Sequence, residues 1–155
     1  GNLIEINTLR GIGRIPALAE KVHAHGGKVI ATVVVCNPWI LSNLEPYVDG
    51  MTFQYTVSPV AMGNALGAQM DVLSGDFNPT GKMSLTMVSS PEVIAITEKE
   101  IDGVMREICA SPNDVPGYDK DRYIDPEILN HVKGGSYAYC DADGNYYRSG
   151  FGLHY

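Results

Sequence analysis

The sequence predicts an α/β protein, a layered α/β/α sandwich with a mostly parallel sheet and a C-terminal β-hairpin. Residues 28–36 read Lys-Val-Ile-Ala-Thr-Val-Val-Val-Cys, a nearly continuous β-branched run that is typical of a parallel strand covered on both faces. Strand and helix patterns alternate up to residue 88, as they do in a sheet with helices on its faces. Tyrosines on both sides of the turn sequence at 141–145 predict the hairpin.

A short extended entry and a helix are predicted before the strand at 28–36. Residues 1–13 place apolar side chains at nearly alternating positions, which favours an extended segment. Pro16 suits the first turn of the helix that follows, and Gly26-Gly27 is a glycine signal for its end.

A second strand and a second helix are predicted after residues 28–36. Asn37-Pro38 ends the first strand, and residues 40–44 predict a short helical turn. Residues 49–55 predict the next strand, and Ser58 is placed to cap the helix that follows. One face of that helix is apolar and consists of Met62, Leu66, Met70 and Leu73.

The last third of the chain predicts smaller elements after a short strand at 84–88. Thr97-Glu98-Lys99-Glu100 has the spacing of a capping box and predicts a helix to about residue 108. Residues 111–125 are rich in Pro, Asp, Gly and Tyr and predict a surface loop, and a short helix is predicted from 125 to about 132. The predicted hairpin spans residues 136–147.

Composition limits the classes of partner. The 155 residues fit one domain, and 45% hydrophobic with 19% charged residues is ordinary for a globular protein. A net charge of −7 without a basic stripe argues against nucleic acid and membrane surfaces as partners. No apolar run reaches the roughly 20 residues of a membrane span. Cys36, Cys109 and Cys140 are odd in number and far apart, which favours reduced thiols and a cytoplasmic location; an upstream export signal remains an alternative.

Two loop motifs fail as cofactor or metal sites. Residues 75–83 have five residues between their glycines where a P-loop has four, and Met83 stands where the P-loop hydroxyl is needed. An EF-hand loop that starts at Asp141 needs Gly and Glu where Tyr146 and Gly152 stand. The histidines and cysteines also lack ligand spacing, so we predict neither a cofactor nor a metal.

The same segment at 75–83 resembles a family signature. Gly63-Asn64-Ala65 and Asp71-Val72-Leu73-Ser74 lead into Gly-Asp-Phe-Asn-Pro-Thr-Gly-Lys-Met. This order is similar to the Gly-Asn-Ala helix and Leu-x-Gly-Asp-x-Asn-Pro-Ser-Gly-Arg-Leu-Pro run near the end of the second domain of glycoside hydrolase family 3. About 70 residues later, Gly-Phe-Gly-Leu-His-Tyr at 150–155 resembles the family's closing Phe-Gly-x-Gly-Leu-Ser-Tyr. Ser84 and His154 depart from the family's Pro and Ser.

The resemblance implies that residues 1–155 form a single domain, the second half of the family's C-terminal sandwich domain. Members are typically retaining β-glycosidases, hydrolases of carbohydrate metabolism that cleave O-glycosyl bonds in β-glucosides or β-xylosides. Retention requires two carboxyl groups about 5–5.5 Å apart. The family nucleophile is an Asp on a preceding (β/α)8 barrel of about 250 residues, which is missing from these 155 residues. The implied partners are this N-terminal barrel domain and, through the full-length enzyme, a carbohydrate substrate.

The resemblance also bears on individual residues. The family's acid/base Glu lies on a loop that falls at or before the first residue of this chain. Glu5 is the only nearby carboxylate and is therefore the acid/base candidate, although its apolar flanks are typical of a strand. Tyr137, Tyr139 and Tyr146 of the hairpin are candidates for stacking on a sugar ring, although Tyr is also an ordinary strand residue. We expect this chain alone to be inactive.

Two other functions remain open. The chain is alternatively a stand-alone, non-catalytic module that binds carbohydrate or another protein. A third interpretation is an unrelated doubly wound domain that binds a phosphorylated ligand at a helix N-terminus, although the glycine fingerprint is absent. Half a sheet leaves an open edge and an uncovered apolar face, so we expect an exposed hydrophobic patch or self-association through the side formed by residues 1–35.

Overall fold

The computed structural model describes residues 4–5, 12–35, 38–55, 59–94, 97–108, 121, 124 and 126–152. These residues form a mixed α/β structure, as the sequence predicts. The helices are α1 (Ile15–Ala24), α2 (Pro59–Ser74) and α3 (Pro126–His131). The strands are β1 (Ile4–Glu5), β2 (Ile30–Val34), β3 (Trp39–Ile40), β4 (Gly50–Gln54), β5 (Thr97–Ile101) and β6 (Val104–Ile108).

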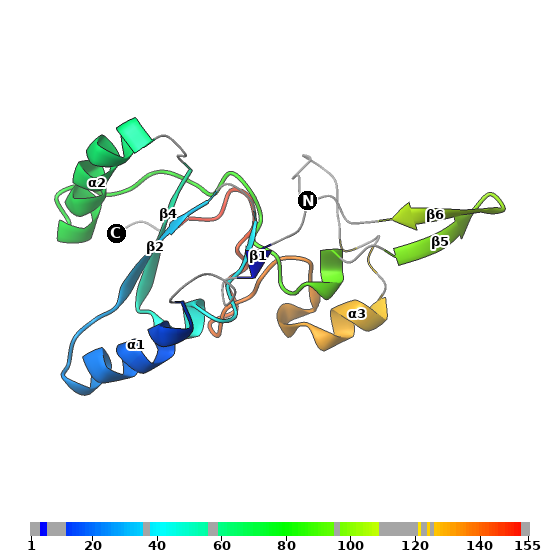
Figure 1. Ribbon diagram of the computed structural model, residues 1–155, viewed down its shortest axis with the longest axis horizontal. Coiled ribbons are helices and arrows are strands. Elements are labelled where there is room, and N and C mark those ends of the chain that lie inside the picture. The colour runs from blue at the N-terminus through cyan, green and yellow to red at the C-terminus, as the bar shows by residue number, and fades with distance from the viewer. Residues whose placement is uncertain are drawn as a thin grey trace.

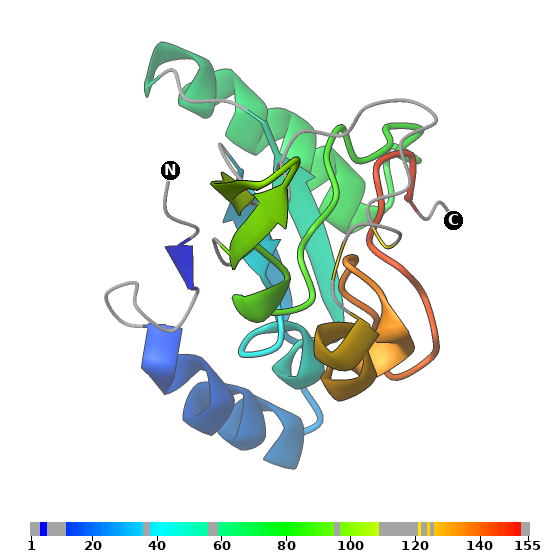
Figure 2. The ribbon, with the colours of Figure 1, turned by 90° about the vertical axis from the view of Figure 1, so that its right-hand side faces the viewer.

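Two parallel strand pairs are present. The strands predicted at 28–36 and 49–55 are confirmed as β2 and β4, which pair in parallel with Ile30 opposite Gly50 and Val34 opposite Gln54. The shorter pair joins β1 to β3, also in parallel. The β2–β4 pair lies between α1 and α2 in both ribbon views (Figures 1 and 2).

The prediction that the strand at 28–36 is covered on both faces is wrong. Val33 is 5% exposed and packs into the core, whereas Ile30 is 49% and Val34 38% exposed. Because side chains alternate along a strand, one face of β2 is packed and the other is open except beneath α2. The β-branched run therefore specifies a strand, and only half of its side chains are used in the core.

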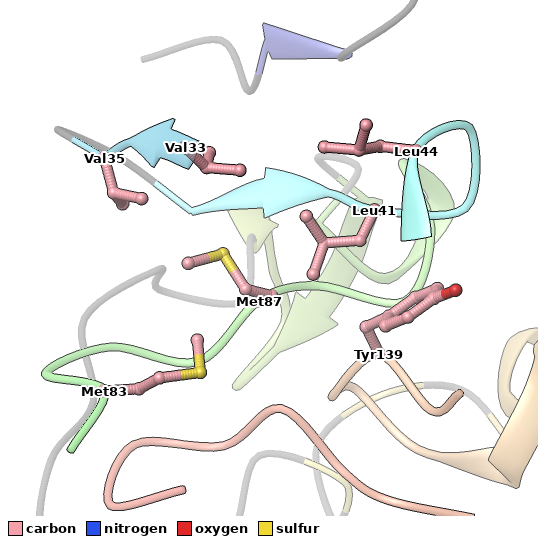
Figure 3. Close-up of a cluster of buried hydrophobic side chains, with 7 residues drawn as sticks. All are labelled: Val33, Val35, Leu41, Leu44, Met83, Met87 and Tyr139. Atoms are coloured by element: carbon pink, nitrogen blue, oxygen red, sulfur yellow. The ribbon is translucent and has the colours of Figure 1, made fainter. Parts of the chain in front are cut away.

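The main core lies on the packed face of β2 (Figure 3). Its buried side chains are Val33, Val35, Leu41, Leu44, Met83, Met87 and Tyr139. The strand predicted at 84–88 is an extended segment with isolated bridges from Val88 to Ile40 and to Ala138. In the same segment, the Met87 amide donates to the Tyr147 carbonyl and the Met87 carbonyl accepts from the Tyr139 amide, both at 2.9 Å. The C-terminal hairpin region thus packs against the centre of the chain.

A second cluster lies beneath α3. Its buried side chains are Ile40, Val88, Val93, Ile124 and Tyr137, and partly buried residues of α3 and its neighbours pack on them. The helix predicted from residue 125 is confirmed as α3. The predicted turn of the hairpin is also confirmed, because the Asp141 amide donates to the Asn145 carbonyl at 3.1 Å and Cys140 forms an antiparallel bridge with Tyr146.

The helix predicted at 97–108 is wrong. These residues form the antiparallel hairpin of β5 and β6, which projects from the rest of the chain (Figure 1). The strands meet at Asp102 and Gly103, whose φ angles of 53° and 75° are both left-handed. Asp-Gly with two left-handed residues is the strongest short signal for a two-residue hairpin turn, and it overrides the capping-box spacing.

The helix predicted before residues 28–36 is confirmed as α1, whereas the chain between β2 and β4 differs in part from the prediction. Pro16 lies in the first turn of α1, and the Gly27 amide returns to the Val22 carbonyl at 3.0 Å to end the helix. The turn predicted at 40–44 is present from Leu41, whose carbonyl accepts from the Leu44 and Glu45 amides at 2.9 and 2.8 Å. Ile40 itself belongs to β3, and a 3₁₀ helix follows at Glu45–Tyr47 with Pro46 in its first turn.

Some predictions fall outside the described residues. These are the Ser58 cap, the loop at 111–120, the thiols of Cys36 and Cys109, and the end of the closing motif at 153–155. The thiol of Cys140 is buried and free. None of the described helices combines the length and the hydropathy that crossing a bilayer requires.

Candidate functional site

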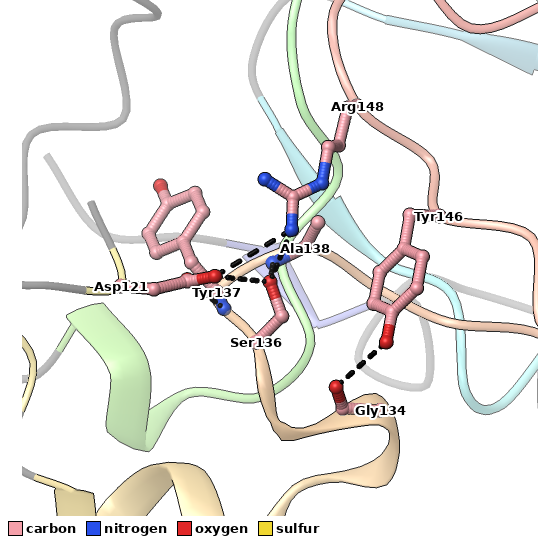
Figure 4. A network of polar contacts seen from close by, with 7 residues as sticks. All are labelled: Asp121, Gly134, Ser136, Tyr137, Ala138, Tyr146 and Arg148. Atoms are coloured by element: carbon pink, nitrogen blue, oxygen red, sulfur yellow. Dashed lines mark hydrogen bonds and ion pairs between the residues drawn. The ribbon is translucent and has the colours of Figure 1, made fainter. Parts of the chain in front are cut away.

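The tyrosines proposed to stack on sugar are engaged with the protein. Tyr137 is 2% and Tyr139 5% exposed, so neither offers an open ring face. The Arg148 guanidinium lies 5.2 Å from the centre of the Tyr146 ring, and the Tyr146 hydroxyl donates to the Gly134 carbonyl at 2.8 Å (Figure 4). Glu5 lies in β1, and its side chain is outside the described part of the structure.

An aromatic cluster explains the tyrosines near the hairpin. The rings of Tyr139 and Tyr147 meet edge to face at 5.5 Å, and Phe53 and Phe151 extend the cluster. Burial first, and then the hydrogen bond to Glu45, raises the pKa of the Tyr139 phenol far above its usual range. That bond is 2.7 Å long. These rings form core contacts, a role that alternating tyrosines in a strand pattern also indicate.

A polar network joins Asp121 to the chain before and after the hairpin turn (Figure 4). The Ser136 hydroxyl donates to Asp121 Oδ2 at 2.8 Å, and the Tyr137 amide donates to Asp121 Oδ1 at 2.7 Å. Arg148 Nη2 donates to the Ser136 hydroxyl at 2.9 Å. Because the Ser136 proton points to a carboxylate and the network also holds the backbone, its role is structural.

The two segments that carry the family resemblance are neighbours in space. The Met83 amide donates to the Phe151 carbonyl, and the Gly150 amide donates to the Met83 carbonyl, each at 2.8 Å. The Lys82 ammonium donates to the Gly152 carbonyl across 70 residues of sequence. A Cβ at Gly152 would lie 2.8 Å from the Gly81 carbonyl oxygen, so the close approach requires glycine. We call this contact between residues 81–83 and 150–152 the motif junction.

The loop that begins this signature ends α2 tightly. Gly75 has a φ of 84°, the left-handed conformation that ends helices. The Phe77 amide donates to the Asp71 carbonyl at 3.0 Å, and the Ser74 hydroxyl donates to Asp76 at 2.7 Å. The Gly-Asp pair therefore closes the helix through local bonds.

A pocket of about 690 Å³ opens beside α3. Its walls come from distant parts of the chain: the turn at 42–46, the segment at 89–92, residues 127–133, and Tyr139. Its charged and ionisable lining residues are Glu92, Glu127, His131 and Lys133, and its hydroxyl-bearing ones are Ser42, Ser89, Ser90 and Tyr139. Sequence reasoning missed this site because no single motif contains it. We call it the α3 pocket.

The described carboxyl groups with a shifted pKa are poor general acids. The nearby Ser90 side chain, with the residue's own amide, lowers the pKa of Glu92. Burial raises the pKa of Asp141, but hydrogen bonds from Asn145 and Asp143 outweigh it and leave the value lowered. Bonds from Lys28, Val29 and His23 lower the pKa of Asp49. A glycosidase acid instead needs a raised pKa. The described residues also hold no group of three or more candidate metal ligands.

Comparison of the chain with protein-family models, curated proteins and solved structures found no match. The family resemblance therefore remains an expectation from the two sequence motifs.

Proposed function

We propose that this chain is the C-terminal portion of a retaining β-glycosidase and supports reactive groups that other parts of the enzyme supply. The observation that carries the proposal is the motif junction. Backbone hydrogen bonds tie Met83 to Gly150 and Phe151, so the two segments that resemble glycoside hydrolase family 3 act as one structural unit. The glycine requirement at 152 explains why the closing motif keeps Gly at that place.

The proposal includes a finer architecture than the one described above. In it, residues 28–88 belong to a layered α/β/α sandwich with a mostly parallel sheet, completed by segments of the whole enzyme. The position of the β2–β4 pair between α1 and α2 supports this arrangement. So does the exposure of Ile30 and Val34, at 49% and 38%, because a two-stranded parallel sheet is normally covered.

The N-terminal barrel domain covers this open side in the proposed enzyme, and self-association is the alternative when the barrel is absent. The free thiol of Cys140 supports a cytoplasmic location, which belongs to the same proposal. The carbohydrate substrate is bound and cleaved by the full-length enzyme.

The lowered pKa values of the described carboxyl groups support the proposal that other parts of the enzyme supply the reacting groups. Asp49, Glu92 and Asp141 all have lowered pKa values and are ionised at neutral pH. A retaining enzyme needs one carboxyl that is protonated before bond cleavage. The proposed source of that proton and of the nucleophile lies outside the described residues.

Complementation tests this function. The chain is co-expressed with the whole missing N-terminal part of a family 3 β-glucosidase, that is, the (β/α)8 barrel together with the first half of the sandwich domain, and hydrolysis of nitrophenyl β-glucoside and β-xyloside is followed. We expect turnover from the pair and none from either half. Absence of turnover from two halves that are each folded by circular dichroism would contradict the proposal.

Two glycine variants make the test specific to the motif junction. Gly152→Ala puts a methyl group against the Gly81 carbonyl and should abolish complementation. Gly67→Ala, in α2, meets nothing within 4 Å and should preserve it. Equal activity of the two variants would mean that the junction does not support the enzyme.

A further inference from the structure

We propose that the outer edge of β2, the edge that faces away from β4, pairs with the same edge of a second copy of this chain. The two strands run antiparallel about a two-fold axis at Thr32 and join the two β2–β4 pairs into one sheet. The inference concerns the chain by itself and does not rest on the enzyme assignment. It gives a residue-level geometry to the self-association that the sequence predicts for the side formed by residues 1–35.

The backbone hydrogen bonds of β2 indicate which residues face its outer edge. The Val35 amide donates to a carbonyl of β4, and the Val29 carbonyl accepts from the amide just before β4, both at 2.7 Å. Because backbone groups alternate in direction along a strand, Ile30, Thr32 and Val34 turn theirs to the outer edge. Among the described residues, no strand or isolated bridge pairs with that edge.

A groove of about 370 Å³ runs along this edge. Its lining includes four consecutive residues of β2, at 31–34. Because neighbouring residues point to opposite faces of a strand, a groove that touches all four follows the edge. Ile15, Trp39 and Leu44 supply the rest of the lining and make it apolar. Apolar walls beside open backbone groups are the features of a site that accepts an added strand.

The composition of β2 favours another β2 as the added strand. Open edge strands are normally protected by charged residues or proline, and residues 29–35 contain neither. The nearest charge is on Lys28, whose ammonium donates to Asp49 at 2.7 Å. Two copies of this uncharged, β-branched strand therefore meet without like charges opposite each other.

The register follows from the two-fold symmetry. An axis at Thr32 pairs Ile30 with Val34 of the second copy, and Val34 with its Ile30. These are the residues whose backbone groups face the edge, so each pair exchanges both of its backbone hydrogen bonds. Ile30 and Val34 are 49% and 38% exposed in the single chain, and the pairing packs them against each other.

Sedimentation velocity of the full chain tests the proposal. We expect a reversible, concentration-dependent change from the 16.8 kDa monomer to twice that mass. Hydrogen exchange of the Ile30, Thr32 and Val34 amides should slow together as the dimer forms. A chain that stays monomeric at its highest soluble concentration would overturn the proposal, and so would a dimer in which these amides exchange as fast as in the monomer.

A charge-exchange experiment tests the register. Ile30→Lys and Val34→Glu each place a charge opposite an apolar residue at both ends of the pair, so each alone should weaken dimerisation about tenfold. Mixing the two variants brings opposite charges together at one end and leaves the other end apolar, which should restore association. Failure of the mixture to associate, with both variants folded by circular dichroism, would refute the antiparallel pairing.

Two further lysine substitutions serve as controls. Val104→Lys in the β5–β6 hairpin and Leu66→Lys on α2 change side chains that are 54% and 56% exposed. Both variants should dimerise as the original chain does. Loss of the dimer in either would assign the interface to that surface and overturn the pairing of β2. Because this experiment needs no catalysis, a monomeric chain that still restores turnover would overturn the dimer alone.

Discussion

The two faces of the β2–β4 pair differ in polarity: one is apolar and the other is polar. On one face, Val33 and Val35 pack against Leu41 in a cluster whose members are almost inaccessible to water. On the other face, Thr32 and Thr52 lie opposite each other and contact Gln69, a buried residue of α2. The first face gains stability from apolar burial, and the second holds a helix in place by hydrogen bonds.

The contact of α2 with the polar face of the sheet leaves apolar side chains of α2 exposed to water. Gln69 Nε2 donates to both threonine hydroxyls, and its Oε1 accepts from Gln54 Nε2 at 2.7 Å. With Gln69 turned to the sheet, Leu66 and Met70 are 56% and 60% exposed. The difference teaches that an amphipathic helix pattern does not by itself say which side of the helix meets the sheet.

The largest effect that tests this comparison is expected at Leu41, which is completely buried. Leu41→Ala should destabilise the chain by about 2–5 kcal/mol, because the removed side chain leaves a cavity in the packed face. The free energy of unfolding in urea measures it. The control is Leu66→Ala, whose exposed side chain should change stability by no more than about 0.5 kcal/mol. A loss at Leu66 equal to that at Leu41 would mean that the outer face of α2 is also packed.

A smaller loss is expected at Gln69. Gln69→Ala removes the partner of two threonine hydroxyls and should cost about 1–3 kcal/mol in the same urea experiment. Combining Gln69→Leu with Thr32→Val and Thr52→Val removes the amide and both hydroxyls and leaves only the partly exposed Gln54 amide, which water can reach, so that variant should be more stable than Gln69→Ala. If the triple variant is less stable than Gln69→Ala, the polar face contributes more than satisfied hydrogen bonds.

A substitution at Tyr139 separates the contribution of packing from that of a hydrogen bond on the packed face. Tyr139→Phe keeps the ring in the core and removes the 2.7 Å hydrogen bond to Glu45, so we expect a loss of about 1 kcal/mol. Tyr47→Phe alters a tyrosine that is 40% exposed and serves as the control, with no change in midpoint expected. An unchanged midpoint for Tyr139→Phe would show that packing alone holds the ring.

The smallest effect concerns the edge of the pair, where Asp49 precedes β4. Lys28 Nζ and His23 Nε2 donate to it at 2.7 Å and the Val29 amide at 2.9 Å, and these bonds lower its pKa. A lowered folded-state pKa contributes stability above the ordinary Asp value of about 3.9, and this contribution is lost as the pH falls below it. Thermal melts between neutral and acidic pH should show a shallower acid decline for Asp49→Asn. Identical slopes would contradict this role.

The strands were predictable where local sequence decides them. The β-branched residues of 28–36 and the Gly-Met-Thr-Phe-Gln-Tyr sequence at 50–55 specify β2 and β4 without reference to neighbours. At 97–108 two local signals compete, and the Asp102-Gly103 turn prevails because both residues adopt left-handed angles. The exposed face of α2 was not predictable, since the contact of Gln69 with Thr32 depends on residues far apart in sequence.

The candidate sites also combine features that local sequence indicates with features that depend on contacts between distant residues. The motif junction involves two segments that sequence marked separately, while their hydrogen bonds became visible only in the structure. The α3 pocket joins Ser42, Glu92 and Lys133, which share no motif or spacing. Tyr137 and Tyr139 were expected from the sequence to stack on a sugar ring, but both are buried. Alternation in the sequence does not reveal which side of the hairpin meets the core.

The central claim is that the chain supports glycoside cleavage without carrying the reacting groups. The most direct test is the hydrolysis of nitrophenyl β-glucoside by the purified chain alone, measured beside an intact family 3 β-glucosidase at equal concentration. We predict a rate equal to that of buffer. Turnover that follows the purified chain through gel filtration, and that disappears when the chain is unfolded in urea, would contradict the claim.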